Sequence, residues 1–227
     1  MRAAILREFG TPLDIVDDFP RPVPGPGEVL LAVEACGVCH SDLHLASGDW
    51  PAFEKLVKRP LILGHEIAGR VVELGPGAAP GLSNARVGVP WVFWSCGNCP
   101  NCAEGRENIC QNRAITGVTV NGGYAQFLLA KASHVIPIPD GLSSAEAAPL
   151  FCAGVTVYRA LRNAEVKPGQ RVAVFGIGGL GHLAVQAAVA MGAEVTAVDV
   201  DDAKLELARR SGARTIIQSP PKNAAAE

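Results

Sequence analysis

The stretch RVAVFGIGGLGHLAVQAAVAMGAEVTAVDV, residues 171–200, decides the fold of the C-terminal part of this chain. The segment RVAVFG at 171–176 reads as a strand, GLGHLAVQAAVAMG at 179–192 reads as a helix, and EVTAVDV at 194–200 reads as a second strand. The same alternation continues with DDAKLELARRSG and TIIQ. Strands that alternate with helices in this way predict a parallel sheet with crossover helices.

The turn inside this stretch has the spacing of a dinucleotide-binding loop. Gly176, Gly178 and Gly181 form G-x-G-x-x-G, with Gly179 inside the pattern. Such glycines allow a tight turn and let the backbone approach a pyrophosphate at the helix N-terminus. Asp199, at the end of the next strand, is suited to accept hydrogen bonds from a ribose and to repel a 2′-phosphate. We predict a dinucleotide site that favours NAD over NADP; a glycine-rich turn of another doubly wound fold is the alternative.

The part of the chain before residue 150 has a different pattern. Short apolar β segments are separated by Gly and Pro, including PRPVPGPGE at 20–28. The expected strands are AAIL, EVLLAVEA, IAGRVVEL, RVGVPWVFW and GYAQFLLA. The sequence therefore predicts a two-domain α/β protein, with a β-rich domain over 1–154 and a partial Rossmann domain, its first βαβαβ half only, over 155–227.

Four cysteines in the β-rich part have the spacing C-x2-C-x2-C-x7-C. They are Cys96, Cys99, Cys102 and Cys110. A disulfide framework is typical of short secreted domains, whereas this chain has 227 residues, seven cysteines and an opening MRAAILREFG without a signal-like apolar region. A reduced, cytoplasmic setting fits better. Iron–sulfur ligation uses other spacings, so we predict a closed tetrahedral zinc site.

The composition is that of an ordinary globular protein, with 48 % hydrophobic residues, 19 % charged residues and a formal net charge of −2. No basic run could neutralise phosphates, and no apolar stretch approaches the roughly 18 residues that a membrane span needs. We expect neither nucleic-acid nor membrane partners.

Three cysteines lie outside the tight cluster: Cys36, Cys39 and Cys152. Cys39 and His65 both occur in apparent turns near strand ends. Two cysteines and one histidine are a known ligand set for catalytic zinc, so a second metal site is plausible. The alternatives are a small buried thiol and a hydrogen-bonded imidazole.

The segments CHSDLH (39–44), GHE (64–66), APLFCAGVTVY (148–158) and GIGGLG (176–181), with the four-cysteine segment, occur in an order that resembles a known family. They resemble the zinc-dependent alcohol dehydrogenases of the medium-chain dehydrogenase/reductase family, particularly its microbial branch, along essentially the whole chain. The resemblance implies a GroES-like catalytic domain, NAD, a small alcohol or aldehyde substrate, and a homodimer or homotetramer.

The resemblance also implies two zinc ions per chain. The catalytic zinc takes Cys39, His65 and Cys152, and the structural zinc takes the four clustered cysteines. Asp42 orients the His65 imidazole, and Glu66 is an outer or alternate ligand. Cys36 has no matching role and is expected to be a core thiol.

Further roles are implied around the reaction itself, in which hydride passes from the alcohol to nicotinamide. A proton leaves through Ser41 and His44; the alternative for His44 is a solvated loop residue. Cofactor contacts are implied for His40, Thr156 and Lys204, the last of which could be a plain surface lysine. Trp50 and Trp91 line a pocket for a short primary alcohol, unless they are core packing.

The chain departs from the family at its C-terminal end. A second βαβαβ half would need on the order of 70 more residues, and QSPPKNAAAE shows no sign of a fourth strand. A fragment, a partial sequence and a shortened protein with another role are the three explanations. For this chain we expect an unpaired sheet edge, weak cofactor binding and poor solubility.

Two classes of function therefore stay open. One is an NAD-linked zinc alcohol dehydrogenase; the other is a non-catalytic zinc-binding remnant of the family. Among enzymes, an NADP-linked relative for larger or aromatic alcohols is the second choice. A zinc-free quinone reductase is disfavoured because every ligand position is filled.

Overall fold

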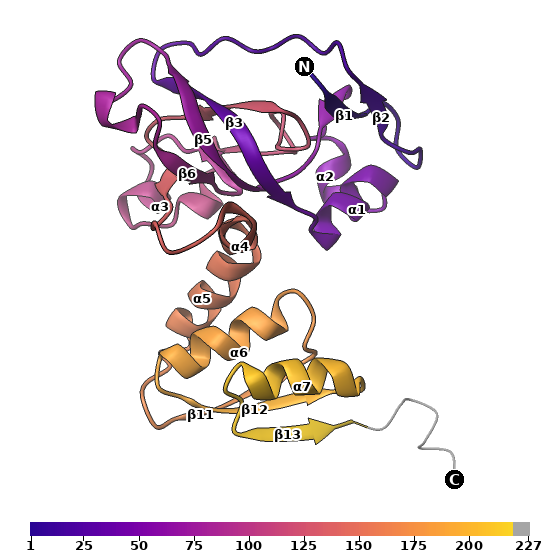
Figure 1. Ribbon diagram of the computed structural model, residues 1–227, viewed down its shortest axis with the longest axis vertical. Helices are drawn as coiled ribbons and strands as arrows, with labels where there is room; N and C mark the ends of the chain where they lie inside the picture. The colour runs from indigo at the N-terminus through magenta and orange to yellow at the C-terminus, as the bar shows by residue number, and fades with distance from the viewer. Residues whose placement is uncertain (220–227) are drawn as a thin grey trace. The chain divides into compact units, whose positions relative to one another are not determined.

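The computed structural model describes residues 1–219 and divides into two compact units, Met1–Cys152 and Ala153–Glu227 (Figure 1). Each unit is described by itself below. The boundary predicted from the sequence lay two residues further along the chain. The expectation that no strand forms in the final tail falls largely on residues 220–227, which lie outside the described residues.

The centre of the first unit is a five-stranded antiparallel sheet in the order β10-β6-β5-β3-β9. Its strands are β3 (Glu28–Gly37), β5 (Glu66–Leu74), β6 (Arg86–Val89), β9 (Phe127–Lys131) and β10 (Ile136–Pro137). Valine, leucine and isoleucine side chains from these strands form one buried cluster, which includes Leu31, Ile67 and Val87. The long strands β3 and β5 run side by side through this sheet (Figure 1).

Two smaller β structures complete the first unit. One sheet has the order β2-β1-β4, formed by β1 (Ala3–Leu6), β2 (Asp14–Val16) and β4 (Leu61–Ile62); the other pairs β7 (Val92–Trp94) with β8 (Ala114–Ile115). The predicted single strand RVGVPWVFW is wrong as one element. Pro90 has no amide hydrogen to donate and separates β6 from β7.

The helices of the first unit are short. They are α1 (His40–Ser47), α2 (Pro51–Glu54), α3 (Pro100–Ala103) and α4 (Ser144–Ala147), with 3₁₀ turns η1 (Pro80–Leu82), η2 (Glu107–Ile109) and η3 (Ala148–Phe151). Helix α1 begins after Cys39, whose amide donates to the Asp42 carboxylate at 2.9 Å. It ends at Gly48, where φ is 72°, a conformation that suits glycine.

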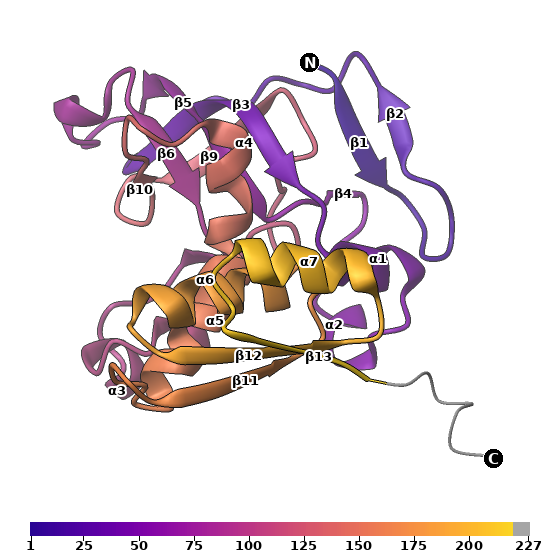
Figure 2. The same cartoon turned by 60° about the horizontal axis from the view of Figure 1, so that its bottom comes forward.

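The second unit is a parallel three-stranded sheet with crossover helices, which confirms the fold predicted from residues 171–200. The elements are α5 (Ala153–Asn163), β11 (Arg171–Phe175), α6 (Gly181–Ala190), β12 (Glu194–Asp199), α7 (Asp202–Arg210) and β13 (Thr215–Gln218). The strand order is β11-β12-β13, and α6 and α7 lie over one face of the sheet (Figure 2). Asp201 caps α7 by accepting from the amides of Ala203 and Lys204.

Strand β11 is an edge of this sheet within the described residues, and the Phe175 side chain at its end is 78 % exposed. The expectation of an unpaired edge at the first strand therefore holds for the described part of the chain. None of the helices in residues 1–219 combines the length and the apolar character that crossing a membrane requires.

Candidate active site and metal centres

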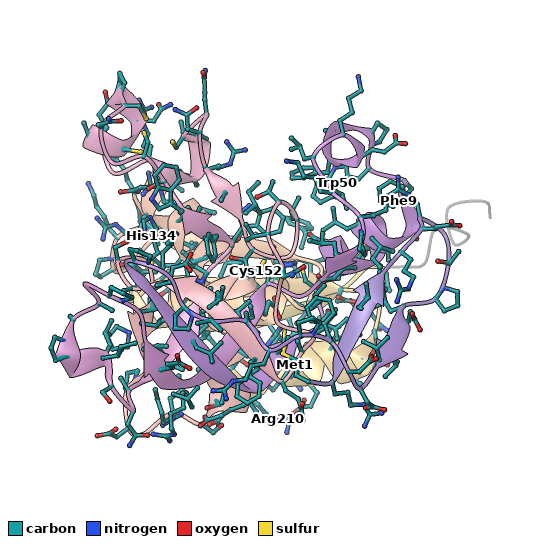
Figure 3. The ribbon with its side chains drawn as sticks, turned by 90° about the horizontal axis from the view of Figure 1, so that it is seen from above. Met1, Phe9, Trp50, His134, Cys152 and Arg210 are labelled. Carbon is teal, nitrogen blue, oxygen red and sulfur yellow. The ribbon has the colours of Figure 1, made fainter. Side chains whose placement is uncertain are left out.

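Three potential metal ligands converge in the first unit. Cys39 lies between β3 and α1, and His65 lies between β4 and β5. Cys152, which is labelled in Figure 3, follows η3. Their ligand atoms lie within 4.8 Å of one another. The fold thus brings together the three residues for which the family resemblance implied a catalytic zinc.

The protonation states of the three groups in this trio depend on one another. Contacts with Cys152 and His65 lower the pKa of the Cys39 thiol to about 3. Burial opposes protonation of His65, but Asp42 and Cys39 outweigh it and raise the pKa of the imidazole to about 9. The same Cys39 contact, together with burial, raises the pKa of Cys152.

The donor set fits a zinc ion. Two sulfurs and one imidazole nitrogen are an established set for catalytic zinc, which keeps a fourth position open. His65 is fully buried, its Nδ1 lies 3.2 Å from Asp42 Oδ1, and its Nε2 has no hydrogen-bond partner among the described residues. A buried nitrogen without a partner costs free energy, and a metal bound between this nitrogen and the two sulfurs would remove that cost.

Asp42 is buried and links the chain segments that carry two of the ligands. Its Oδ2 accepts from the Cys39 amide at 2.9 Å, and its Oδ1 accepts from the Gly64 amide at 3.1 Å. Burial would raise the pKa of this carboxyl, but its contacts with His65 lower it overall. Asp42 is therefore placed to orient the imidazole as the resemblance implied.

Glu66 follows His65 and is also buried. A Cβ atom at Gly37 would lie only 2.0 Å from Glu66 Oε2, so the carboxylate rests against this glycine and a side chain there would push it aside. The charge of Glu66 contributes to the raised pKa of Cys152. The carboxylate is thus close enough to the trio to act on it electrostatically.

Aromatic rings form a continuous row beside His65. The Trp91 ring meets His65 edge-on at 4.7 Å, Phe53 lies 6.1 Å from Trp91, and Trp50 lies 4.4 Å from Phe53, all between ring centroids. Trp50 is labelled in Figure 3. The two predicted pocket residues are therefore connected by Phe53, which sequence reasoning missed because nothing in PAFEK distinguishes it from a core residue.

The two proposed proton-relay residues lie on α1. The Ser41 hydroxyl and amide both contribute to lowering the pKa of Cys39, which places Ser41 against that sulfur. His44 Nδ1 lies 2.9 Å from Asp49 Oδ1, and the His44 side chain is 43 % exposed. His40 is exposed, and its ring lies 4.8 Å from that of His44. Asp49 was not expected from the sequence.

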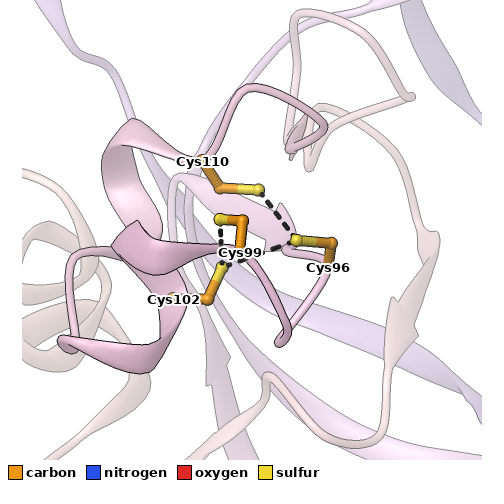
Figure 4. Close-up of side chains that lie close together, drawn as sticks. All are labelled: Cys96, Cys99, Cys102 and Cys110. Carbon is orange, nitrogen blue, oxygen red and sulfur yellow. Dashed lines mark hydrogen bonds between the residues drawn. The ribbon is translucent and has the colours of Figure 1, made fainter.

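The four clustered cysteines form a second centre (Figure 4). Their sulfurs are 3.8 Å apart for Cys96 and Cys102, 3.5 Å for Cys99 and Cys102, and 3.6 Å for Cys110 and Cys96. All seven cysteines are free, and a tetrahedral zinc with bonds of about 2.3 Å places its sulfurs about 3.8 Å apart. The geometry fits one metal and excludes disulfides, whose sulfurs are about 2 Å apart.

Protonation in this cluster is uneven. Backbone amides of Asn98 and Cys99 lower the pKa of Cys96 to about 6, whereas burial raises that of Cys102 to about 11. Ligation by a dication favours the thiolate form of all four groups, so metal uptake is coupled to proton release.

The glycine-rich loop of the second unit lies between β11 and α6. Gly176 has φ of 83°, and a Cβ at Gly181 would lie 1.9 Å from the Gly176 carbonyl oxygen. A Cβ at Gly178 or Gly179 would meet nothing within 4 Å. Gly176 and Gly181 are thus required by the fold, while the two between them leave open space for a ligand.

The Asp199 side chain accepts a hydrogen bond from this loop. Its Oδ2 accepts from the Ile177 amide at 2.6 Å, and its Oδ1 accepts from the amides of Val200 and Asp201. These bonds, with the Ile177 amide first, lower the pKa of Asp199, and the charge of Lys204 adds to the effect. Lys204 therefore lies near enough to Asp199 to act on its charge, and Thr156 is exposed on α5. The cofactor contacts implied for these two residues stay predictions.

Comparison with known proteins identifies the family. The model for the alcohol dehydrogenase GroES-like domain matches residues 25–140, and that for zinc-binding dehydrogenases matches 179–227. The chain belongs to the zinc-binding alcohol dehydrogenase family. An alcohol dehydrogenase of Geobacillus stearothermophilus is 49 % identical over 225 residues, which cover 99 % of this chain and 66 % of that protein.

Solved structures of alcohol dehydrogenase relatives share the fold. Acetophenone reductase from Geotrichum candidum, in complex with NAD, has a TM-score of 0.86 and 38 % identity, and covers 98 % of this chain. The protein CAD from Helicobacter pylori, complexed with NADP(H), has a TM-score of 0.85 and 33 % identity over 96 % of this chain. The chain spans 64 % and 63 % of these two structures, respectively.

Proposed function

We propose that this chain carries the catalytic domain of an NAD-linked, zinc-dependent alcohol dehydrogenase that interconverts a small primary alcohol and its aldehyde. The observation that carries the proposal is the convergence of Cys39, His65 and Cys152 around a buried, unpartnered nitrogen. Because this trio offers three ligands, one position is left for substrate.

A zinc ion held by this trio supplies Lewis acidity, which lowers the pKa of an alcohol and favours hydride loss to nicotinamide. The protein contributes orientation. Asp42 holds the imidazole of His65 and, through two amides, the segments on which Cys39 and His65 lie. A site whose ligands are fixed in this way loses little entropy when the metal binds.

The proton of the alcohol has a route outward along α1. Ser41 lies against Cys39, and His44 follows three residues later, about one helical turn away. The His44 side chain is partly exposed, so it can pass a proton to solvent, and its Nδ1 lies beside Asp49 Oδ1. Ser41→Ala and His44→Ala should each slow alcohol oxidation, measured as the rate of NADH formation.

The size of the substrate is set by the aromatic row. Trp91 packs directly against the zinc ligand His65, and Phe53 and Trp50 extend this wall. Large rings beside the metal leave room for a short alcohol. Trp91→Ala should therefore raise kcat/KM for longer alcohols relative to ethanol, and an unchanged ratio would contradict this assignment.

Asp199 supports NAD rather than NADP. Its buried carboxylate, kept ionised by backbone amides, is placed to accept from a ribose hydroxyl and to repel a 2′-phosphate. Some related structures contain NAD and others NADP(H), so the cofactor preference of this chain has to be measured directly. We expect tighter binding of NADH than of NADPH, and Asp199→Ala should reduce the difference.

The central test is zinc content per chain, measured together with alcohol-dependent NADH formation. Two zinc ions with NADH formation support the enzyme, and loss of one zinc and of turnover in Cys39→Ser would locate the reaction. Two zinc ions without turnover would instead favour the zinc-binding remnant. Cys36→Ser is the matched control, because this thiol lies outside both ligand groups.

A further inference from the structure

Tyr124 is a polar residue beside the segment that carries His65, and the site as described above gives it no role. Its amide donates to the Leu63 carbonyl at 3.0 Å, and its carbonyl accepts from the Ala4 amide at 2.8 Å. The chain around Tyr124 is therefore fixed against the segment that leads into His65. Its ring rests on Gly64, where a Cβ atom would lie 2.7 Å from the ring.

The phenol hydroxyl reaches the carboxylate that supports His65. Tyr124 donates to Asp42 Oδ2 at 2.9 Å; the Gly37 carbonyl, at 3.4 Å, is a second and longer acceptor. Burial and the charge of Asp42 raise the pKa of Tyr124, so the phenol stays protonated and can only donate to the carboxylate.

Both oxygens of the Asp42 carboxylate therefore accept hydrogen bonds. Oδ2 accepts from Cys39 N–H and Tyr124 O–H, while Oδ1 accepts from Gly64 N–H and lies 3.2 Å from His65 Nδ1. The terminal torsion of an aspartate is intrinsically broad. Removing the phenol hydroxyl leaves one donor on Oδ2 and lets the carboxylate rotate away from the plane that serves the imidazole.

We propose that Tyr124 is a positioning residue of the catalytic metal site: its hydroxyl fixes the Asp42 carboxylate and thereby the orientation of His65. The inference deepens the proposed function, since it rests on metal binding by the trio. Tyr124 touches neither ligand atoms nor substrate in this role. It acts only through Asp42.

The test compares Tyr124→Phe with the wild-type chain, because phenylalanine keeps the ring on Gly64 and removes only the hydroxyl. The measurement is zinc or cobalt affinity by chelator competition, with the cobalt absorption spectrum as a report on ligand geometry. We expect about 10-fold weaker binding at the trio, in the range of outer-shell effects, and unchanged binding at the four cysteines. Tyr158→Phe, the matched control, loses the only other tyrosine hydroxyl and should change neither affinity.

A double-mutant cycle separates positioning from general stability. In an Asp42→Asn background, Tyr124→Phe should add little further loss of affinity, because the two groups act as a unit. Equal, additive losses in both backgrounds, or a lower unfolding midpoint of the metal-free chain with unchanged metal affinity, would overturn the proposal. A wild-type chain that binds metal only at the four cysteines would refute the proposed catalytic site itself, an outcome that the variant comparison cannot mimic.

Discussion

Gly88 in β6 lies directly against the ring of Phe151, the residue before Cys152. A Cβ atom at Gly88 would lie 1.8 Å from Cζ and 2.0 Å from Cε2 of Phe151, the residue before Cys152. Carbon atoms pack best at about 3.5–4.0 Å, so the ring would have to move by roughly 2 Å. Phe151 is 8 % exposed and packs against Ala68 and Ile138, which leaves little room for that movement.

We therefore expect Gly88→Ala to weaken metal binding by the trio of Cys39, His65 and Cys152 without changing a ligand. Overpacking of this kind costs about 1–3 kcal/mol. If the strain relaxes through Cys152, it lowers metal affinity at the trio by about 5- to 150-fold, since about 1.4 kcal/mol corresponds to a factor of ten. The four-cysteine site lies on other elements and should keep its affinity.

The assay is metal content after dialysis against a chelator of graded strength, with denaturant unfolding of the metal-free chain. Gly81→Ala is the matched control, because a Cβ there meets nothing within 4 Å. Phe151→Leu in the Gly88→Ala background should restore part of the affinity by removing the clashing ring atoms. Wild-type affinity and an unchanged midpoint in Gly88→Ala would refute the reasoning.

Three further predictions follow from the second centre and the second unit. Gly181→Ala should lower unfolding stability by about 1–3 kcal/mol, because the new methyl group meets the Gly176 carbonyl at 1.9 Å, whereas Gly178→Ala should leave stability unchanged and weaken NADH binding measured by fluorescence. Cys102→Ser should remove one zinc and lower the melting temperature while the trio keeps its metal; loss of both ions would contradict independent sites. The pKa of Asp199 is lower in the folded chain than its ordinary value of about 3.9, so its ionised carboxylate stabilises the fold above about pH 3.9. This stabilisation is lost as the pH falls through the lowered pKa of the folded chain. Stability measured across about pH 2–5 should therefore depend less on pH in Asp199→Asn.

Local patterns predicted the second unit and the four-cysteine centre well. The glycine spacing and the strand–helix alternation act within about 30 residues, so G-x-G-x-x-G and its flanking elements could be recognised directly. The cluster of Cys96 to Cys110 is equally local. The single strand predicted across Pro90 was wrong. The prediction followed the run of apolar residues and gave too little weight to proline, which has no amide hydrogen to donate to a neighbouring strand.

The trio proposed to bind the catalytic metal had no local signal. Cys39, His65 and Cys152 are far apart in sequence, and only family resemblance joined them before the structure brought their atoms within 4.8 Å. Phe53 and Tyr124 were missed for the same reason. Their importance depends on which ring or carboxylate lies beside them, and this is decided by tertiary packing of segments with no sequence periodicity in common.

The two candidate metal sites differ in how much of the chain must be folded before each can form. The four sulfurs of the closed centre come from one segment ending at Cys110, so this centre can take up its ion while the rest of the polypeptide is still being synthesised. The open centre requires residues as far apart as Cys39 and Cys152 and exists only once the sheet and η3 have assembled. The closed site should therefore bind its metal first and help the segment from Cys96 to Cys110 to fold. The open site should bind metal last, once the first unit is complete.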